Sequence, residues 1–181
     1  MTVAQNKFSN NIIEYVLFMW QMEDLARAAD FNPDVYASLL GEGRTEEDRR
    51  DEMEWFEGLC STMKNESCVI SGHIQELERL VAELQQLHYN LLRVIEDKQY
   101  QQTYVSVYPS LQEFQKHMTE DGKSDVESLL TGLYGLLVLK LKGKEVSGPT
   151  QKAMDEFSQL LGLLAAHYRR RKDSESNINL N

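Results

Sequence analysis

Apolar side chains recur every three or four residues along most of the chain, which is the spacing of a helix face. The clearest stripe lies within residues 73–97 and comprises Ile74, Leu77, Leu80, Val81, Leu84, Leu87, Leu91, Leu92 and Ile95. No alternating pattern of convincing length predicts a strand, although the β-branched and aromatic content of residues 99–108 allows an extended segment. The pattern therefore predicts an all-α protein.

Capping residues divide the first half of the chain into separate helices. Ser9 or Asn10 can cap a first helix that runs to about Ala29, and Asn32 caps a short second one. Thr45 begins a third helix. The stripe within residues 73–97 forms the fourth.

In the second half, Pro109 is expected to open a fifth helix, and a capping box at residues 124–127 opens a sixth. Residues 120–125 form a loop, and the last helix runs from about Thr150 to Arg171. Short connections favour antiparallel neighbours. The sequence thus predicts a single-domain antiparallel helical bundle of about six to seven helices. This domain covers residues 1–172, and residues 173–181 form a polar, frayed tail.

The most apolar run, residues 129–148, has three possible roles. Its uninterrupted part, Leu129 to Leu139, holds eleven residues, well short of the roughly 20 needed to span a membrane. Its glycine spacing does not match a phosphate-binding loop. We expect it to be the central helix of the bundle, with Gly132 and Gly135 allowing another helix to approach closely.

Charge and cysteine content restrict the partners and the compartment. The net charge of −10 disfavours nucleic acid and anionic membranes as partners, and the basic residues at 169–172 suit the end of a helix. Cys60 and Cys68, eight positions apart on one helix, would be too far apart for a disulfide. The first residues do not have the form of a signal peptide. These features predict a cytoplasmic protein.

No motif of known chemistry survives a test of its spacing. The sequences GxSxG, HExxH and CxxC are absent, and no histidine follows a glutamate by three positions as a di-iron bundle requires. We therefore predict no catalytic residue, no metal and no cofactor. The acidic run at residues 45–58 raises the alternative of a magnesium-dependent nucleotide enzyme. Because its carboxylates fall opposite the apolar face, a solvated surface is favoured.

Polar residues at apolar positions form the candidate ligand pocket. The first helix places Glu23, Asp24 and Arg27 among apolar residues, with Glu23 and Arg27 at the spacing of an ion pair. We expect these groups to contact one another or polar residues on another helix. His73 and His88 are expected on the apolar face of the fourth helix. The candidate pocket residues are Trp20, Glu23, Asp24, Arg27, His73 and His88. The same residues could instead form an internal network that fixes how the helices pack.

Three sequence blocks resemble one bacterial family. They are MWQMEDLARA at 19–28, GHIQELERL at 72–80 with LHYNLL at 87–92, and GLYGLLVLKLKGKEVS at 132–147. The chain resembles an uncharacterised family of small cytosolic proteins, described as a domain of unknown function, over essentially its whole length. The resemblance implies no substrate, cofactor or catalytic residue.

These observations favour a non-enzymatic helical protein that acts through protein–protein contacts, with a homodimer as one form of that contact. Candidate interface residues are Tyr15, Phe18, Trp20, Trp55 and Tyr134. The alternative is a small-molecule binder or hydrolase that uses the candidate pocket.

Overall fold

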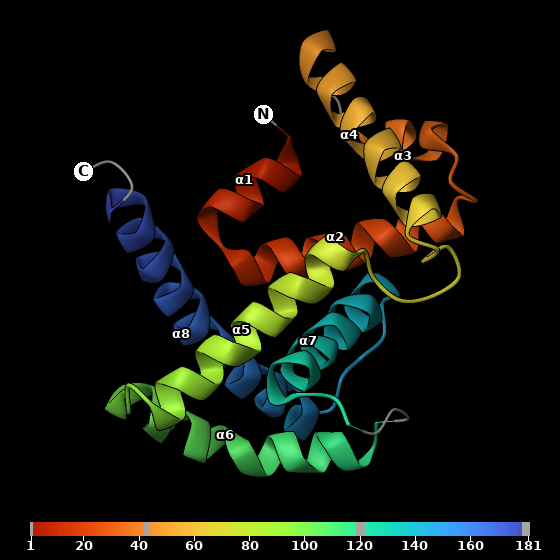
Figure 1. The fold of residues 1–181 in the computed structure, drawn as a ribbon. Helices are drawn as coiled ribbons and strands as arrows, with labels where there is room; N and C mark the ends of the chain where they lie inside the picture. The colour runs from red at the N-terminus through yellow and green to blue at the C-terminus, as the bar shows by residue number, and fades with distance from the viewer. Residues whose placement is uncertain (1, 42–43, 119–121, 179–181) are drawn as a thin grey trace. The chain divides into compact units, whose positions relative to one another are not determined.

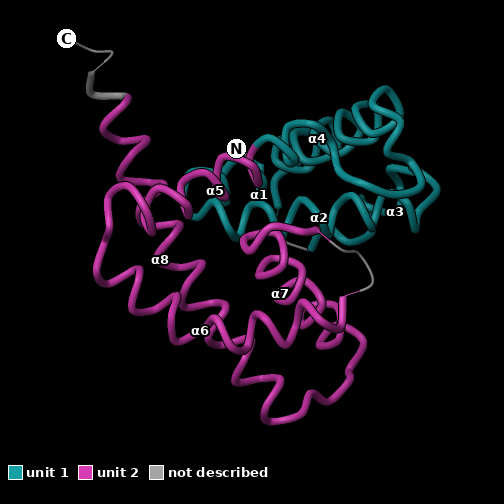
Figure 2. The backbone as a smooth tube through the Cα atoms, turned by 60° about the horizontal axis from the view of Figure 1, so that its bottom comes forward, with its two compact units in different colours: residues 1–79 teal, residues 80–181 magenta. Residues whose placement is uncertain are grey.

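A computed structural model describes residues 2–41, 44–118 and 122–178, and in these ranges it contains eight helices and no strand. The all-α prediction is confirmed, and the expected number of six to seven helices is too low. The chain divides into two compact units, residues 1–79 and residues 80–181, with the boundary inside one helix (Figures 1 and 2). The proposed single domain over residues 1–172 stays a prediction.

Four helices and the start of a fifth make up unit 1. They are α1 (Val3–Asn10), α2 (Ile12–Ala28), α3 (Pro33–Leu39), α4 (Glu46–Asn65) and the beginning of α5 (Gln75–Arg93). α2 packs against α1 and α4, and α3 packs against α4. The predicted caps Asn32 and Thr45 are confirmed by side-chain bonds to the amides of Asp34 and Asp48.

The predicted first helix is two helices separated by Asn11. The backbone of Asn11 is extended, and its side-chain oxygen accepts bonds from the amides of Ile13 and Glu14, so it caps α2. The same residue ends α1, whose own start is capped by Thr2. The prediction of Ser9 or Asn10 as the first cap is therefore wrong by one or two positions.

Unit 2 contains the rest of α5 and three further helices. These are α6 (Lys98–Lys116), α7 (Asp125–Leu141) and α8 (Gly148–Ile178), which pack on one another. In α5 the leucines at 77, 80, 84, 87 and 91 are buried as predicted, but Ile95 lies beyond the helix end and is 61% exposed. α8 continues past the expected end at Arg171.

α6 excludes one alternative that the sequence left open and contradicts one prediction. Residues 99–108 are helical rather than extended, because Tyr100, Val107 and Leu111 repeat at helical spacing and are all buried. Pro109 lies inside this helix instead of opening one. It is exposed to water, where the carbonyl freed by the missing N–H can be solvated.

The predicted central helix, α7, is central only in its first half. Val126, Leu129 and Leu130 are fully buried, whereas Gly135 is exposed and Leu139 and Leu141 are 40% and 65% exposed. Gly132 does allow close approach, since a Cβ there would lie 2.9 Å from a ring carbon of Phe157. The prediction fails for Gly135, because a Cβ at this residue would have no neighbouring atom within 4 Å.

Part of the expected loop at residues 120–125 and the end of the expected tail at 173–181 lie outside the described residues. Within the described ranges, no helix combines the length and the apolar character needed to cross a bilayer.

The two glycines of α7 form a matched pair for mutation. Gly132→Ala should lower the free energy of unfolding because the methyl group would press on the buried Phe157 ring, a cost of about 1–3 kcal/mol for overpacking. Gly135→Ala should raise it by up to about 1 kcal/mol through helix propensity alone. Urea unfolding of both variants measures the difference. Equal effects would contradict the close approach at Gly132.

Candidate functional site

A fully buried carboxylate on α2 organises the candidate site in unit 1. Glu23 is 0% exposed, and its Oε1 accepts a hydrogen bond of 2.9 Å from the backbone N–H of Ile74. Its Oε2 lies 2.5 Å from Nδ1 of His73. A buried charge is costly unless it is paired and hydrogen-bonded. Both oxygens of Glu23 meet this requirement with groups at the start of α5.

His73 lies just before α5, so its predicted place on the helix is wrong. Its ring stacks on Trp20 with 4.6 Å between centroids and 13° between planes. Because an ionised carboxylate can only accept hydrogen bonds, Nδ1 of His73 is assigned as the donor. The side chain is 37% exposed. Nε2 therefore remains as the ring atom that can accept a proton.

Arg27 ties the chain segment after α4 to α2. Its guanidinium donates to the backbone carbonyl of Cys68 at 3.1 and 3.3 Å and to the carbonyl of Gly72. It also pairs with Asp24 at 2.9 Å. The spacing of Glu23 and Arg27 does not lead to an ion pair between them: Glu23 bonds to His73 and the Ile74 amide, and Arg27 bonds to Asp24 and the two carbonyls.

These bonds define a stapled loop, residues 67–73, held near both ends by α2. Ser67 and Gly72 have φ values of 61° and 83°, in the left-handed region that allows the chain to turn sharply. The amide of Cys68 also bonds to the carbonyl of Met63 at 3.0 Å. The backbone of the loop is thus fixed by a carboxylate, a guanidinium and the end of α4.

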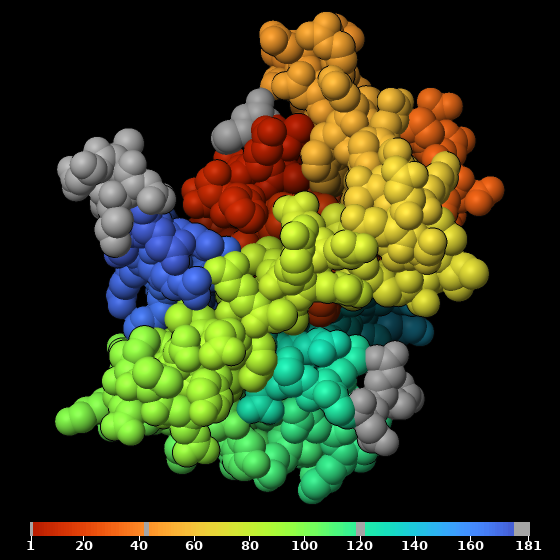
Figure 3. Space-filling model, in the orientation of Figure 1, coloured from red at the N-terminus to blue at the C-terminus, as the bar shows by residue number. Residues whose placement is uncertain are grey.

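Ile70 lies in the middle of the stapled loop and is 88% exposed. No other large apolar side chain among those found exposed in the described residues has a higher exposed fraction. The loop belongs to the yellow part of the chain, which reaches the surface in Figure 3. The structure therefore presents a branched apolar side chain to water on a short loop whose two ends are held by α2 and by the end of α4.

Five of the six predicted pocket residues meet in unit 1, and His88 does not. Trp20, Glu23, Asp24, Arg27 and His73 are connected by the contacts above. Arg27 bonds to backbone carbonyls of the stapled loop and Glu23 to the backbone amide of Ile74, and no side-chain pattern in the sequence could reveal these backbone partners. The interface prediction is wrong for Tyr15 and Trp20, since both are buried.

His88 belongs to a separate network inside unit 2. It is 3% exposed, with Nδ1 2.8 Å from the hydroxyl of Tyr100 and Nε2 3.6 Å from Oδ2 of Asp125. The hydroxyl of Tyr104 donates to the same Asp125 oxygen at 2.7 Å. Burial raises the pKa of Tyr100 and keeps it a neutral hydroxyl. This arrangement satisfies buried polar groups, which is the structural alternative that the sequence left open.

Asp125 is the charged member of this network. Its hydrogen bonds, first from His88 and then from Tyr104 and Gln115, hold the pKa of its carboxyl below the usual range, against the effect of burial. Asp125 also lies in the first turn of α7, where a negative charge is favoured by the helix dipole.

The acidic run of α4 does not form a metal site within the described ranges, where no three His, Cys, Asp or Glu side chains gather closely enough. One of its members, Glu52, is buried and accepts bonds from the Tyr36 hydroxyl at 2.8 Å and the Val3 amide at 2.7 Å. Cys60 and Cys68 are free and buried, and burial raises the pKa of both thiols. Neither has the character of a reactive nucleophile.

Comparison with known proteins identifies the family. The family model described as Domain of unknown function (DUF4924) matches residues 1–175. The chain belongs to this family. No curated protein and no solved structure matches the chain. The DUF4924 family description assigns no activity, so the contacts above carry the functional argument.

Removal of the Arg27 donors should loosen the stapled loop. Arg27→Met leaves the Cys68 and Gly72 carbonyls without their charged donor, and we expect the free energy of unfolding to fall by about 2 kcal/mol. Backbone amides in residues 68–74 should exchange hydrogen faster in mass spectrometry. Arg79→Met, at an exposed arginine that bonds the Gln75 carbonyl of its own helix, is the control. Equal exchange in both variants would contradict the staple.

Asp125 should contribute to the acid sensitivity of folding. Its folded pKa is depressed, so its stabilisation is fully present above the unfolded pKa, about 3.9, and is lost as pH falls through the folded value. The difference in free energy of unfolding between wild type and Asp125→Asn should therefore be constant near neutral pH and shrink in acid. The exposed Glu57→Gln serves as control. A difference that grew on acidification would refute this role.

Proposed function

We propose that this protein is a non-enzymatic helical binding protein that acts through protein–protein contacts, and that the stapled loop makes the contact. The observation that carries the proposal is the 88% exposure of Ile70 on a loop fixed by Glu23 and Arg27. The protein is further proposed to be bacterial and cytoplasmic, with its helices in an antiparallel bundle. Two free buried thiols suit a reducing compartment.

A single exposed apolar side chain is ordinary on a protein surface. Ile70 differs from other exposed apolar residues because buried charged groups hold its loop. The carboxylate of Glu23 is fully buried and the side chain of Arg27 is only 16% exposed, and both bond to backbone groups near the ends of the loop. An anchor that is already rigid loses little entropy when it inserts into a partner. The loop thus combines an apolar anchor with preorganisation, the properties of a binding hot spot.

The alternative of a small-molecule binder or hydrolase has a narrower basis. Glu23 orients His73 as a carboxylate orients a catalytic base, and Nε2 is available to take a proton. Among the described residues the hydrogen-bond partner of the His73 ring is Glu23, so a nucleophile would have to be water or part of the substrate. The stacking of the ring on Trp20 and the bond to the loop give His73 a structural role that needs no substrate.

The proposal is tested in the native cell with the protein tagged at its own locus. In extract, the wild-type protein should migrate in a complex larger than its own 20.9 kDa chain. Ile70→Asp should abolish that complex because burying an unpaired charge against an apolar surface of the partner is costly. Val105→Asp, at another exposed apolar residue but in unit 2, is the matched control. A complex that survives Ile70→Asp unchanged would contradict the proposal.

A further inference from the structure

The acidity of the chain is concentrated in the unit that carries the stapled loop. Residues 1–79 hold 16 Asp and Glu against 7 Lys and Arg, a net charge of −9, whereas residues 80–181 hold 13 against 12, a net charge of −1. A partner of the stapled loop therefore approaches a negative field. Such a field favours a surface that is apolar and carries positive charge.

The chain itself has such a surface, the α7 C-terminal segment, residues 136–144. Leu136 and Leu137 are half-buried, and Leu139 and Leu141 are 40% and 65% exposed. Leu137 and Leu141, four positions apart, lie on the same side of the helix and form one apolar surface, whereas Leu139 lies on a different side.

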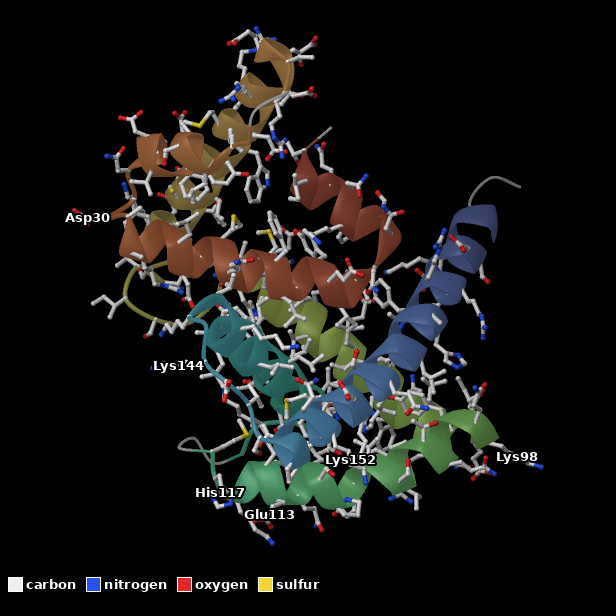
Figure 4. The ribbon with its side chains drawn as sticks, turned by 180° about the vertical axis from the view of Figure 1, so that it is seen from behind. Asp30, Lys98, Glu113, His117, Lys144 and Lys152 are labelled. Atoms are coloured by element: carbon white, nitrogen blue, oxygen red, sulfur yellow. The ribbon has the colours of Figure 1, made fainter. Side chains whose placement is uncertain are left out.

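Three lysines lie in the same segment as these leucines. Lys140, Lys142 and Lys144 are exposed, and within the described ranges they form no ion pair. Figure 4 labels Lys144 on the connection between α7 and α8. Positive charge at the end of a helix is favourable by itself. The helix dipole explains why lysines occur at this end of α7. It does not explain why the leucines beside them are exposed to water.

We infer that a second copy of this chain is the partner, with the stapled loop of one copy seated on the α7 C-terminal segment of the other. This inference rests on the proposed function and names the partner. Ile70 supplies the apolar anchor, and Leu137 and Leu141 of α7 supply the surface that receives it. The lysines face the negative field of unit 1 of the other copy. A two-fold axis would form the contact twice, once in each direction.

The same charges disfavour a different dimer, in which the stapled loops of the two copies contact each other. Such a dimer would bring two units of net charge −9 together. Like charges in contact oppose association. The loop-to-α7 contact instead places the negative unit against a positive segment, and its strength should fall as salt screens the charges.

Sedimentation velocity of the purified protein over a concentration series tests the inference. The wild type should form a dimer that weakens with salt. Ile70→Asp, Leu141→Asp and the double variant Lys142→Glu/Lys144→Glu should each reduce the dimer fraction at least tenfold. Ile95→Asp, at an exposed residue of neither surface, should leave it unchanged. Thermal melting of each variant checks that the fold is retained.

Mixing two variants separates this contact from other dimers. Ile70→Asp retains an intact α7 segment, and Leu141→Asp retains an intact loop, so a mixture can form one good contact per pair. The mixture should dimerise more than either variant alone. No gain on mixing would overturn the loop-to-α7 contact, and so would a wild type that stays monomeric at every concentration. If the monomer nevertheless forms an Ile70-dependent complex in extract, the proposed function stands and the partner is another protein.

Discussion

The carboxylate of Glu23 is the constraint around which unit 1 is arranged. A side chain with no exposure to water must find hydrogen-bond donors for both oxygens, and in α2 all the helical N–H groups near it are already used. The donors come from about 50 residues later in the chain, the ring of His73 and the amide of Ile74. Their positions fix where α5 begins. The Trp20–His73 stack and the Arg27 bonds to the stapled loop then follow from the same placement.

The sequence predicted features that depend on neighbours along the chain. Asn32, Thr45 and Ser124 cap helices as expected because a cap needs only its own side chain and the next few amides. The leucine stripe of α5 was predictable for the same reason. Pro109 misled the prediction because its effect depends on whether its side of the helix faces water, and this is decided by tertiary packing.

The sequence identified most residues of the candidate site, but it did not predict which groups they contact. Charged residues at apolar positions of α2 indicated that Glu23 and Arg27 must be compensated. Local spacing suggested that they compensate each other, but backbone groups of the stapled loop and His73 do so instead. Backbone carbonyls are identical in every residue, so no sequence pattern marks Cys68 or Gly72 as acceptors. Likewise, only the structure shows that Ile70 is exposed while Tyr15 is buried.

The bonds from α2 to the segment after α4 also close a ring in the chain. Between Arg27 and Cys68 the chain leaves α2, forms α3 and α4, and returns to the place it left. The entropy of closing such a ring grows only with the logarithm of its length, by about 0.6 kcal/mol per doubling. Insertions or deletions between α3 and α4 should therefore cost little, whereas inserting or deleting one residue between Cys68 and Ile74 would move the bonded backbone groups away from their partners on α2. Length variation in the family should consequently be found in the α3–α4 connection and not in the stapled loop.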